Sequence, residues 1–272
     1  MVNARYAVIG NPVEHSKSPE IHTAFAQATR QIIAYQRLLA PLDKFRETID
    51  QFRAEGAAGC NITVPFKRKA FAFATTLSAR AREAVAVNTL RFDGELVFGD
   101  NTDGVGLVRD IECNLNFPIG KKRILLLGAG GAARGIIGPL LRSKPAQLAI
   151  ANRTFDNAVQ LATQFQALGN ICVLSLENLV EHQFDLVINA TSASLNNSQL
   201  PIPAACFVAQ TLAYDLMYGK VDTPFMRFAK AAGIQAVDGL GMLVEQAAEA
   251  FFVWRGLHPD TAPVIRQLKQ NL

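Results

Sequence analysis

The segment Lys121-Lys-Arg-Ile-Leu-Leu-Leu-Gly-Ala-Gly-Gly-Ala-Ala-Arg-Gly135 decides the fold that this sequence predicts. Its apolar run, Ile124 to Leu127, lies between charged residues and a glycine, which is typical of a buried parallel strand that enters a tight turn. Gly128, Gly130 and Ala133 occupy the three positions of the dinucleotide-binding fingerprint G-x-G-x-x-A. The strand before the turn and the helical spacing of apolar residues after it favour a nucleotide site over a plain strand-to-helix turn.

Each position of this turn has a physical role in binding a dinucleotide. Gly128 allows the sharp turn, Gly130 lets backbone amides approach a pyrophosphate, and Ala133 keeps the helix close to the strand. Amides at the helix N-terminus supply hydrogen-bond donors and partial positive charge for the phosphates. The turn therefore predicts where a cofactor's phosphates bind.

Composition limits the class of protein. The chain has 272 residues, of which 50% are hydrophobic, and this suits one large or two ordinary domains. The net charge is +4 and the basic residues are scattered, so nucleic-acid binding is not supported. The four cysteines, Cys60, Cys113, Cys172 and Cys206, lie far apart, and we expect reduced thiols and no metal site. No signal-peptide layout and no apolar segment of about 20 residues is present, so we expect a cytoplasmic protein without a membrane partner.

The order of the predicted elements indicates two α/β units. In the first hundred residues, strands are predicted at 6–9, 32–39 and 59–64 and as a hairpin at 87–92 and 95–98. Helices are predicted after Ser18, which would be the cap with Pro19 in the first turn, at 43–54 and at 66–74. Later, strands at 124–127, 148–151, 172–174, 186–189, 212–215 and 234–237 alternate with helices at 104–113, 132–142, 156–168 and 223–232. This alternation predicts a doubly wound parallel sheet, and a helical tail at 241–255 and 261–269 follows it.

The cofactor is predicted from the end of the second strand of this unit. An NAD site usually has an acidic residue there, whereas this strand ends in Asn152-Arg-Thr154. The planar guanidinium of Arg153 suits a 2′-phosphate, and Thr154 adds a hydroxyl, so we expect NADP. In the alternative interpretation, Thr154 caps the next helix and Arg153 is solvated.

Three polar clusters in the first unit are candidate sites. Ser16 and Ser18 lie in a strand-to-helix loop, where they could receive a carboxylate or could be ordinary turn and capping serines. Asn61 and Thr63 share one face at the end of a strand, and Lys67 follows, although a lysine in a Lys-Arg-Lys run is often only solvated. The third cluster joins residues 86–89 with 99–104, which turn chemistry alone could also explain.

Together these segments resemble shikimate dehydrogenase nearly from end to end. The resemblance rests on Asn11-Pro12, His15-Ser-x-Ser-Pro19, His22, Asn61-Ile-Thr-Val-Pro-x-Lys67, Ala86-Val-Asn-Thr-Leu90, Gly99-Asp-Asn-Thr-Asp-Gly104, Gly128-Ala-Gly-Gly-Ala-Ala133, Asn152-Arg-Thr154, Asn189-Ala-Thr-Ser192, Tyr218, Thr223-Pro-Phe225 and Gly239-x-Gly-Met-Leu-Val-Glu-Gln246. Such an ordered set is very specific, although each member alone is weak.

The resemblance implies an activity and a set of site residues. The family reduces 3-dehydroshikimate to shikimate with NADPH, and Lys67 and Asp103 would be its catalytic pair. The implied substrate-binding residues are Ser16, Ser18 and Tyr218 for the carboxylate, and Asn61, Thr63, Asn88 and Gln246 for the ring and its hydroxyls. The implied cofactor-binding residues are Gly128, Ala129, Gly130, Gly131, Ala132, Asn152, Arg153, Thr154, Thr191 and Gly239.

The resemblance also implies the domain layout. Residues 1–102 and 238–272 would form a substrate-binding domain with a mixed sheet, and residues 103–237 a Rossmann-like NADP-binding domain, with a cleft between the two. Partners would be the small-molecule substrate and cofactor only, and the protein would be a monomer or a homodimer.

The chemistry agrees with these roles. Reduction of a ketone requires a hydride from nicotinamide and a proton for the developing alkoxide. A lysine ammonium can donate that proton. Enclosure favours the neutral amine and Asp103 favours the ammonium, and the sequence leaves open whether Lys67 or Asp103 is the main proton donor.

Three positions depart from the family pattern, and two alternatives stay open. Asn157 stands where many NADP-preferring members have a basic residue, Ala193-Ser194-Leu195 stands where a glycine is frequent, and residues 219–222 lack the usual proline. NADP selectivity is therefore expected to be moderate. The alternatives are a quinate/shikimate dehydrogenase that uses NAD and a regulator that binds NADP(H) without turnover.

Overall fold

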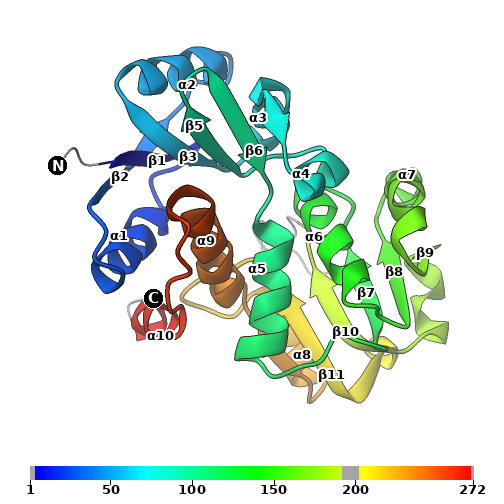
Figure 1. Ribbon diagram of the computed structural model, residues 1–272. Helices are drawn as coiled ribbons and strands as arrows, with labels where there is room; N and C mark the ends of the chain where they lie inside the picture. Colours follow the sequence, from blue (N-terminus) through cyan, green and yellow to red (C-terminus); the bar gives the residue numbers. More distant parts are fainter. Residues whose placement is uncertain (1–3, 192–201, 271–272) are drawn as a thin grey trace. The chain divides into compact units, whose positions relative to one another are not determined.

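The computed structural model describes residues 4–191 and 202–270, and the chain forms two compact units (Figure 1). Unit 1 comprises Met1–Gly106 and Val244–Gln267, and unit 2 comprises Leu107–Leu243 and Leu268–Leu272. The segment Ala193-Ser194-Leu195 lies outside the described residues. Each unit contains one six-stranded sheet, and the predicted α/β class is confirmed.

The sheet of unit 1 is mixed. Its strands are β1 (Ala4–Gly10), β2 (Ile33–Leu39), β3 (Ala57–Ile62), β4 (Thr76–Leu77), β5 (Thr89–Asp93) and β6 (Leu96–Asp100), in the order β2-β1-β3-β5-β6-β4. Its helices are α1 (Ser18–Ala28), α2 (Phe45–Ala54), α3 (Lys67–Phe73) and α4 (Ala79–Ala84), with α9 (Leu240–Arg255) and α10 (Ala262–Gln270) from the end of the chain. β1 pairs in parallel with β2 and β3, whereas β5 is antiparallel to β3 and β6. Figure 1 shows α2 and α3 on one face of this sheet and α1 and α9 on the other.

Alternation along β1 places side chains on both faces of the sheet. Ala7 and Ile9 lie in a core with Phe45 and residues of α3. Tyr6 points to the other face and stacks on Trp254 of α9, with ring centroids 4.5 Å apart. A strand from the start of the chain and a helix from its end therefore share one core.

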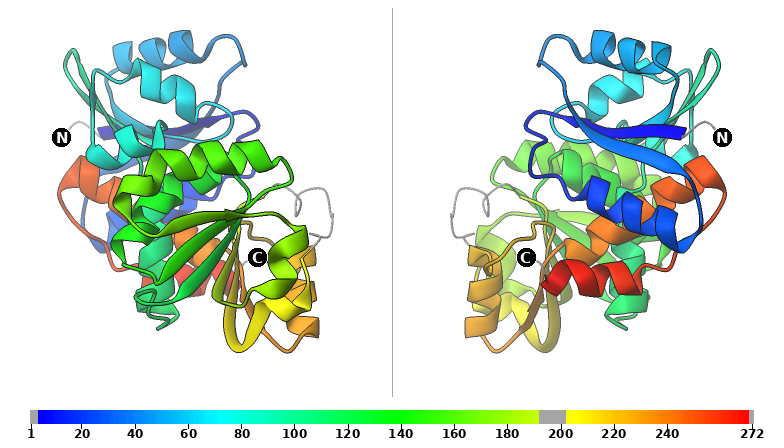
Figure 2. Two further views of the ribbon diagram at one scale, coloured as in Figure 1. Left: turned by 90° about the vertical axis from the view of Figure 1, so that its right-hand side faces the viewer. Right: turned by 90° about the vertical axis from the view of Figure 1, so that its left-hand side faces the viewer.

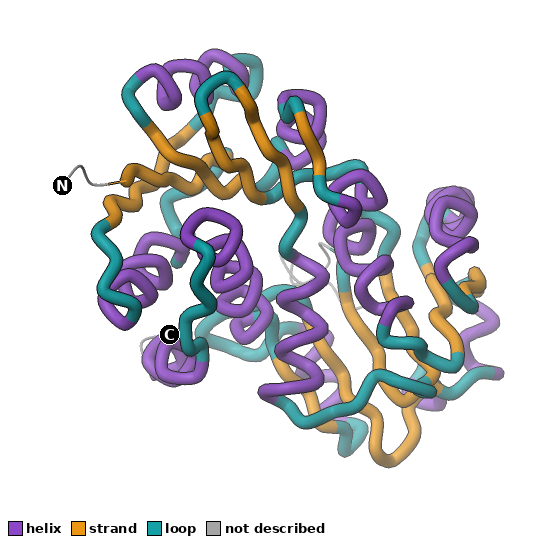
Figure 3. Tube along the Cα trace, in the orientation of Figure 1, coloured by secondary structure: helices purple, strands orange, loops and turns teal. Residues whose placement is uncertain are grey.

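Unit 2 is built on a parallel sheet. Its strands are β7 (Arg123–Leu127), β8 (Gln147–Ala151), β9 (Ile171–Leu174), β10 (Phe184–Asn189), β11 (Phe207–Asp215) and β12 (Gln235–Val237), in the order β12-β11-β10-β7-β8-β9. Its helices are α6 (Gly131–Arg142), α7 (Phe155–Phe165) and α8 (Pro224–Ala231). The helix α5 (Asp103–Arg109) begins in unit 1 and passes into unit 2 after Gly106, where a π-helical turn (Asp110–Asn114) extends it. Figure 3 draws α5 and its extension as a continuous helical segment. The strand order is that of a doubly wound dinucleotide-binding sheet, as predicted.

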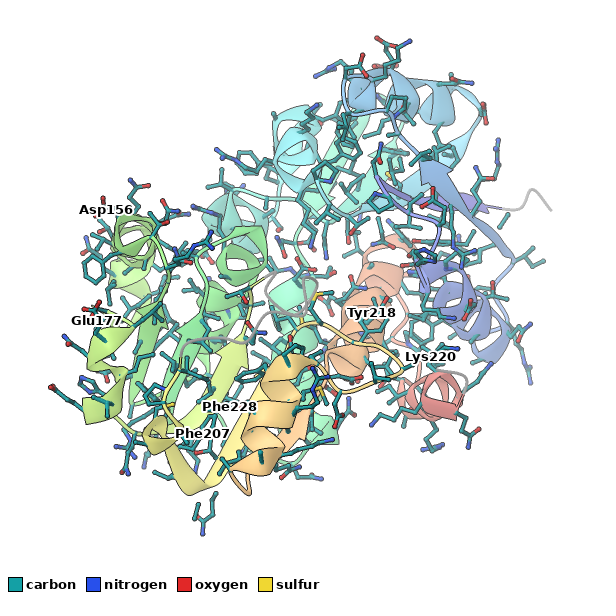
Figure 4. All side chains as sticks on the ribbon, turned by 180° about the vertical axis from the view of Figure 1, so that it is seen from behind. Asp156, Glu177, Phe207, Tyr218, Lys220 and Phe228 are labelled. Carbon is teal, nitrogen blue, oxygen red and sulfur yellow. The ribbon has the colours of Figure 1, made fainter. Side chains whose placement is uncertain are left out.

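Both faces of this sheet are covered. Ile124 and Leu126 of β7 lie in a core with α6 and α7, and the alternate residues Leu125 and Leu127 lie in a second core with α8. The sheet's twist is visible in Figure 2, and Figure 4 labels Phe207 and Phe228, whose rings lie 5.8 Å apart in the second core. Because the strands are parallel, their carboxyl ends meet at one edge, where ligands of such sheets bind.

Three local predictions were wrong or incomplete. Ser18 is the first helical residue of α1, and the cap position belongs to Lys17 without a side-chain cap bond. β3 ends at Ile62, so Thr63 lies beyond the strand and not within it. β4 and α4 were not predicted, because two and six residues are too few for a periodic pattern.

No helix in the described part of the chain is long and apolar enough to cross a membrane. All four cysteines are free.

Candidate active site

Lys67 and Asp103 meet in unit 1. Lys67 is the first residue of α3 and Asp103 the first of α5, and Lys67 Nζ donates a hydrogen bond to Asp103 Oδ2 over 2.6 Å. The side chain of Lys67 is 24% exposed and that of Asp103 is 9% exposed. Phe66, which is fully buried, anchors the start of α3 in the core. The pair is thus a charge-assisted hydrogen bond whose ammonium stays accessible to a ligand.

Asn88 and Gln246 extend this pair into a network. Asn88 Nδ2 donates to Asp103 Oδ1 over 2.8 Å and to Gln246 Oε1 over 3.3 Å. Gln246 reaches this place because α5 and α9 approach each other closely at Gly106. A Cβ atom on Gly106 would lie only 2.6 Å from the backbone nitrogen of Gln246. The structure therefore brings together four of the predicted site residues from α3, the start of α5, the segment before β5, and α9.

Asn61 lies in the same buried network. Its Oδ1 accepts from Tyr35 Oη over 2.8 Å and lies 3.1 Å from His22 Nε2. Its Nδ2 donates to the carbonyl of Asn88 over 3.3 Å and to Thr89 Oγ1 over 3.1 Å. Both acceptor sites and both donors of this amide are thus used by the protein.

The remaining predicted substrate-binding residues of unit 1 are Ser16, Ser18 and Thr63. Ser16 Oγ donates to Ser18 Oγ over 3.2 Å, and the amide of Ser18 donates to Ser16 Oγ over 3.3 Å. Among the described residues, the partly exposed side chain of Thr63 makes no hydrogen bond. Arg37 donates to the carbonyl of Ser16 over 2.6 Å and holds this loop against β2.

Four further polar residues of this network have no role predicted from the sequence. They are the buried His22, Thr89 and Thr102 and the partly buried Tyr35. Burial lowers the pKa of His22 to about 3, although its contact with Asn61 acts in the opposite direction. The signal in the sequence was weak: His22 lies on the apolar face of α1 with Ile21 and Phe25, where a lone polar side chain needs a buried partner.

The glycine turn after β7 fits a pyrophosphate. Gly128 has φ +106°, and a Cβ atom there would lie 3.1 Å from the carbonyl oxygen of Ala190. A Cβ atom on Gly130 or Gly131 would meet nothing within 4 Å, so no protein neighbour requires glycine at these positions. α6 begins at Gly131, and the backbone amides of its first turn, which includes Ala132, have no carbonyl of the same helix to donate to. Gly130, Gly131 and Ala132 are exposed, and Ala129 is half-buried. An open turn with free amides is what a phosphate ligand needs.

Arg153 lies at the end of β8 and is exposed. Among the described residues it makes no hydrogen bond or ion pair, whereas Asn152 Nδ2 donates to the carbonyl of Thr154 over 2.7 Å. Thr154 occupies the cap position of α7, but its side chain makes no cap hydrogen bond. The alternative interpretation placed Thr154 at the cap of this helix with Arg153 in solvent, and both residues lie where it predicts. Asp156, labelled in Figure 4, follows in the first turn of α7.

Thr191, Gly239 and Tyr218 lie in unit 2. Thr191 Oγ1 donates to Asn189 Oδ1 over 2.8 Å at the end of β10. A Cβ atom on Gly239 would overlap the carbonyl of Leu216, so close backbone packing already requires a glycine there. Tyr218, which is half-buried, and Lys220, which is exposed, both lie on the loop between β11 and α8 (Figure 4).

A buried carboxylate that was not predicted holds these loops. Asp215, the last residue of β11, accepts from Asn189 Nδ2 over 3.1 Å and from Thr223 Oγ1 over 2.6 Å. Its other oxygen accepts from the amide of Met217 over 3.0 Å. The loops after β10 and β11 are therefore fixed to one group. Within the described ranges, no cluster of His, Cys, Asp or Glu side chains could hold a metal ion.

Comparison with known proteins identifies the family. The model of the shikimate dehydrogenase substrate binding domain matches residues 8–90, that of shikimate / quinate 5-dehydrogenase matches residues 112–199, and that of the shikimate 5′-dehydrogenase C-terminal domain matches residues 239–269. Relatives named shikimate dehydrogenase (NADP(+)) from Nitrosomonas eutropha and Dechloromonas aromatica are both 57% identical. Each alignment covers 98% of this chain, with 97% of the first relative and 98% of the second. A crystal structure of shikimate 5-dehydrogenase from Thermus thermophilus, in complex with NADP(H) and shikimate, is similar with a TM-score of 0.87 and 33% identity over 99% of this chain and 100% of that chain. The chain belongs to the shikimate dehydrogenase family.

Proposed function

We propose that this protein catalyses the reversible, NADPH-dependent reduction of 3-dehydroshikimate to shikimate. It is then an NADP-dependent oxidoreductase that acts on a CH–OH group. The observation that carries the proposal is the 2.6 Å hydrogen bond between Lys67 Nζ and Asp103 Oδ2, within a network that Asn88 and Gln246 complete. The names of the relatives, which specify shikimate dehydrogenase and NADP(+), support it.

The Lys67–Asp103 pair can manage the proton of this reaction. NADPH, when bound, supplies a hydride to the carbonyl carbon of the substrate. Lys67 then donates a proton from its ammonium to the carbonyl oxygen, so that a C–O–H group forms and a neutral amine is left. In the reverse direction the same amine accepts the hydroxyl proton. Asp103 orients the ammonium through one carboxylate oxygen, and Asn88 holds the other.

The substrate's carboxylate and hydroxyls need separate partners. We propose that Ser16, Ser18 and Tyr218 bind the carboxylate and that Thr63, Asn88 and Gln246 bind the hydroxyls. Thr63 is supported by its hydroxyl, which has no partner among the described residues. Asn61, whose amide is fully used by the protein, lines the ring and holds its neighbours in place.

NADP would bind at the glycine turn and at Arg153. The proposed residues are Gly128, Ala129, Gly130, Gly131, Ala132, Asn152, Arg153, Thr154, Thr191 and Gly239. In this assignment unit 1 is the substrate-binding domain and unit 2 the dinucleotide-binding domain. Support comes from the open turn before α6 and from the exposed Arg153 guanidinium. Asp156 and Asn157 add no positive charge in the next turn, so we expect moderate selectivity for NADP.

A direct assay tests the proposal. The purified protein is mixed with NADPH and 3-dehydroshikimate, and NADPH consumption is followed by absorbance. Parallel reactions use shikimate or quinate with NADP or NAD. Turnover of quinate with NAD above that of shikimate with NADP would favour the NAD-dependent alternative. Binding of NADPH without any consumption would favour a regulator.

Lys67→Ala separates chemistry from binding. The variant loses the proton donor, so we expect kcat to fall by about 100-fold or more. The dissociation constant of shikimate, measured by calorimetry, should change by only a few fold. Arg68→Ala, which removes an exposed cation one residue further on the same helix, is the control and should keep wild-type kcat. If turnover of Lys67→Ala survived, Lys67 would be a binding residue and Asp103 would carry the acid/base role.

A further inference from the structure

We propose that Thr89 is a positioning residue for the reaction proposed above, because its hydroxyl is the middle link of a buried hydrogen-bond chain that ends at Asp103. The inference rests on the proposed function of the Lys67–Asp103 pair. It concerns the orientation of that pair rather than a new contact with substrate. Thr89 is not among the site residues predicted from the sequence.

The chain runs through unit 1. Its links are His22 Nε2 to Asn61 Oδ1 at 3.1 Å, Asn61 Nδ2 to Thr89 Oγ1 at 3.1 Å, Thr89 Oγ1 to Asn88 Oδ1 at 2.9 Å, Asn88 Nδ2 to Asp103 Oδ1 at 2.8 Å, and Lys67 Nζ to Asp103 Oδ2 at 2.6 Å. Both His22 and Thr89 have no exposed surface, and the two asparagines and Asp103 are also buried. Water does not compete for the four links from His22 to Asp103, so each of these is worth more than it would be at the surface.

Two backbone groups fix the direction of this chain. The carbonyl of Asn88 can only accept, so the atom of Asn61 that lies 3.3 Å from it is the amide nitrogen. The amide of Thr102 can only donate, so the atom of Asn88 that lies 2.9 Å from it is the oxygen. Neither side-chain amide can therefore be reversed without placing two donors or two acceptors face to face.

The remaining protons follow from these two orientations. Thr89 must accept from Asn61 and donate its single hydrogen to Asn88. Asn61 Oδ1 accepts, so His22 carries its hydrogen on Nε2, and its Nδ1 is a buried atom without a hydrogen-bond partner. Burial lowers the pKa of His22 to about 3, so the ring stays neutral at the pH of an assay. The direction of the chain is thus constant.

Every donor in this chain points toward the Asp103 carboxylate. Aligned hydrogen bonds polarise one another, and here the last one reaches an oxygen of the anion that orients Lys67. The chain therefore supports the ion pair between Asp103 and Lys67. Loss of the Thr89 hydroxyl would break the chain at its middle, while Asn88 would keep its bond from Thr102.

Other charged groups around Asp103 are engaged elsewhere. Asp100 of β6 and Glu249 of α9 both accept from Arg80 of α4. Glu245 of α9 accepts from Thr261, and Lys69 of α3 donates to the carbonyl of Leu42. Arg68 of α3 is exposed, and the titratable groups Tyr35 and Cys60 lie at the His22 end of the chain. Lys67 is the charged partner of Asp103 itself.

Thr89→Val tests the proposal with the purified full-length protein. The substitution keeps the branched shape and removes the hydroxyl. We expect kcat to fall by about tenfold, with KM for NADPH unchanged. The pH range over which kcat/KM stays high should narrow at both ends by about half a pH unit, because the Lys67–Asp103 ion pair loses this support. Thr89→Ser, which keeps the hydroxyl, should restore the wild-type width.

Thr211→Val is the matched control. Thr211 is a buried threonine of β11 in unit 2, and its Oγ1 donates to the carbonyl of Phe184 over 2.7 Å. The same chemical change there should lower the melting temperature and leave the pH profile in place. If Thr89→Val lowered kcat/KM equally at every pH and left the width of its pH profile unchanged, the defect would be purely structural and the proposal would be overturned.

His22→Phe decides the question if Thr89→Val does not fold. It keeps a ring beside Tyr35, removes the donor at the far end of the chain, and removes the unpartnered Nδ1. We expect the pH profile of kcat/KM to narrow at both ends, by less than in Thr89→Val. A pH profile as wide as that of the wild type would again overturn the proposal. A wild-type protein that does not consume NADPH would instead contradict the proposed function, so the two failures are distinguishable.

Discussion

Arg153 is the residue on which the proposed cofactor preference depends. Its guanidinium is exposed and makes no hydrogen bond or ion pair within residues 4–191 and 202–270, so binding a 2′-phosphate would break no existing contact. Arg153→Ala should remove one or two charge-assisted hydrogen bonds, each worth about 1.5–3 kcal/mol. We therefore expect KM for NADPH to rise at least about tenfold, with little change for NADH, in steady-state assays with both cofactors.

The control for this variant is another exposed arginine. Arg266→Ala on α10 removes the same charge from unit 1 and should leave both Michaelis constants unchanged. An NADPH-to-NADH preference that Arg153→Ala does not alter would show that the guanidinium does not contact the phosphate. Asn157→Lys should lower KM for NADPH, because it adds a cation in the first turn of the helix that follows Arg153.

Individual residues also show where sequence reasoning ends. Lys67 and Asp103 could be named from motifs, although 36 positions separate them. The hydrogen bonds that occupy every donor and acceptor of the Asn61 side-chain amide could not be predicted. Their partners come from α1, β2 and β5, and no local pattern links these elements. The missing information is which side chains face each other across the sheet, and this depends on packing.

At the scale of elements, the close approach of α5 and α9 sets the position of Gln246. A Cβ atom on Gly106 would lie 2.6 Å from the Gln246 nitrogen and 2.7 Å from its Cβ, so Gly106→Ala must push the helices apart. We expect a destabilisation of about 1–3 kcal/mol in urea unfolding. KM for shikimate should also rise, because Gln246 would move away from Asn88.

Gly120→Ala is the comparison for this effect. A Cβ atom there would lie 3.4 Å from the carbonyl oxygen of Ser143, an ordinary contact, so stability and KM should stay near wild type. A Gly106→Ala protein with unchanged KM would mean that the position of Gln246 does not depend on this helix contact.

Elements with strong periodicity were predicted well. The apolar strands β7, β8 and β10 begin within two residues of their predicted starts and end as predicted. β11 begins at Phe207, five positions before the predicted start, because its first half is only partly buried and carries polar residues. β4 and α4 depend on neighbours, since β4 pairs with β6 and Ser78 caps α4 by accepting from the amide of Ala81 over 3.1 Å.

At the scale of the whole molecule, the end of the chain completes the unit that its beginning starts. From α9, Glu249 accepts from Arg80 over 2.9 Å and Trp254 Nε1 donates to the carbonyl of Leu90 over 2.9 Å. Gln246 reaches Asn88 from the same helix. The candidate site of unit 1 therefore forms only when contacts more than 150 residues apart in sequence are made, as the separations of 169 and 158 residues show.

The ion cluster around Arg80 makes this long-range assembly sensitive to acid. Asp100 is 3% exposed and accepts from Arg80 Nε over 2.7 Å and from Arg80 Nη2 over 2.6 Å. Burial alone would raise the pKa of Asp100, but the bonds and charge of Arg80, with Ser78 and the amide of Asn101, outweigh it and lower the pKa. Because the folded pKa lies below the unfolded value of about 4, the stabilisation is complete above that value and is lost as pH falls through the folded pKa.

Asp100→Asn should therefore lower the free energy of unfolding strongly at neutral pH and less strongly in acid. We expect a loss of about 3 kcal/mol in the free energy of unfolding at pH 7, since a buried ion pair loses one partner. Urea titrations from pH 7 to about pH 3 should show the difference from wild type shrinking as Asp100 becomes protonated in the wild type. Asp93→Asn breaks the exposed Arg91–Asp93 pair and should cost at most about 1 kcal/mol at any pH. A difference between Asp100→Asn and wild type that stays constant down to pH 3 would mean that the carboxylate's charge does not hold the cluster together.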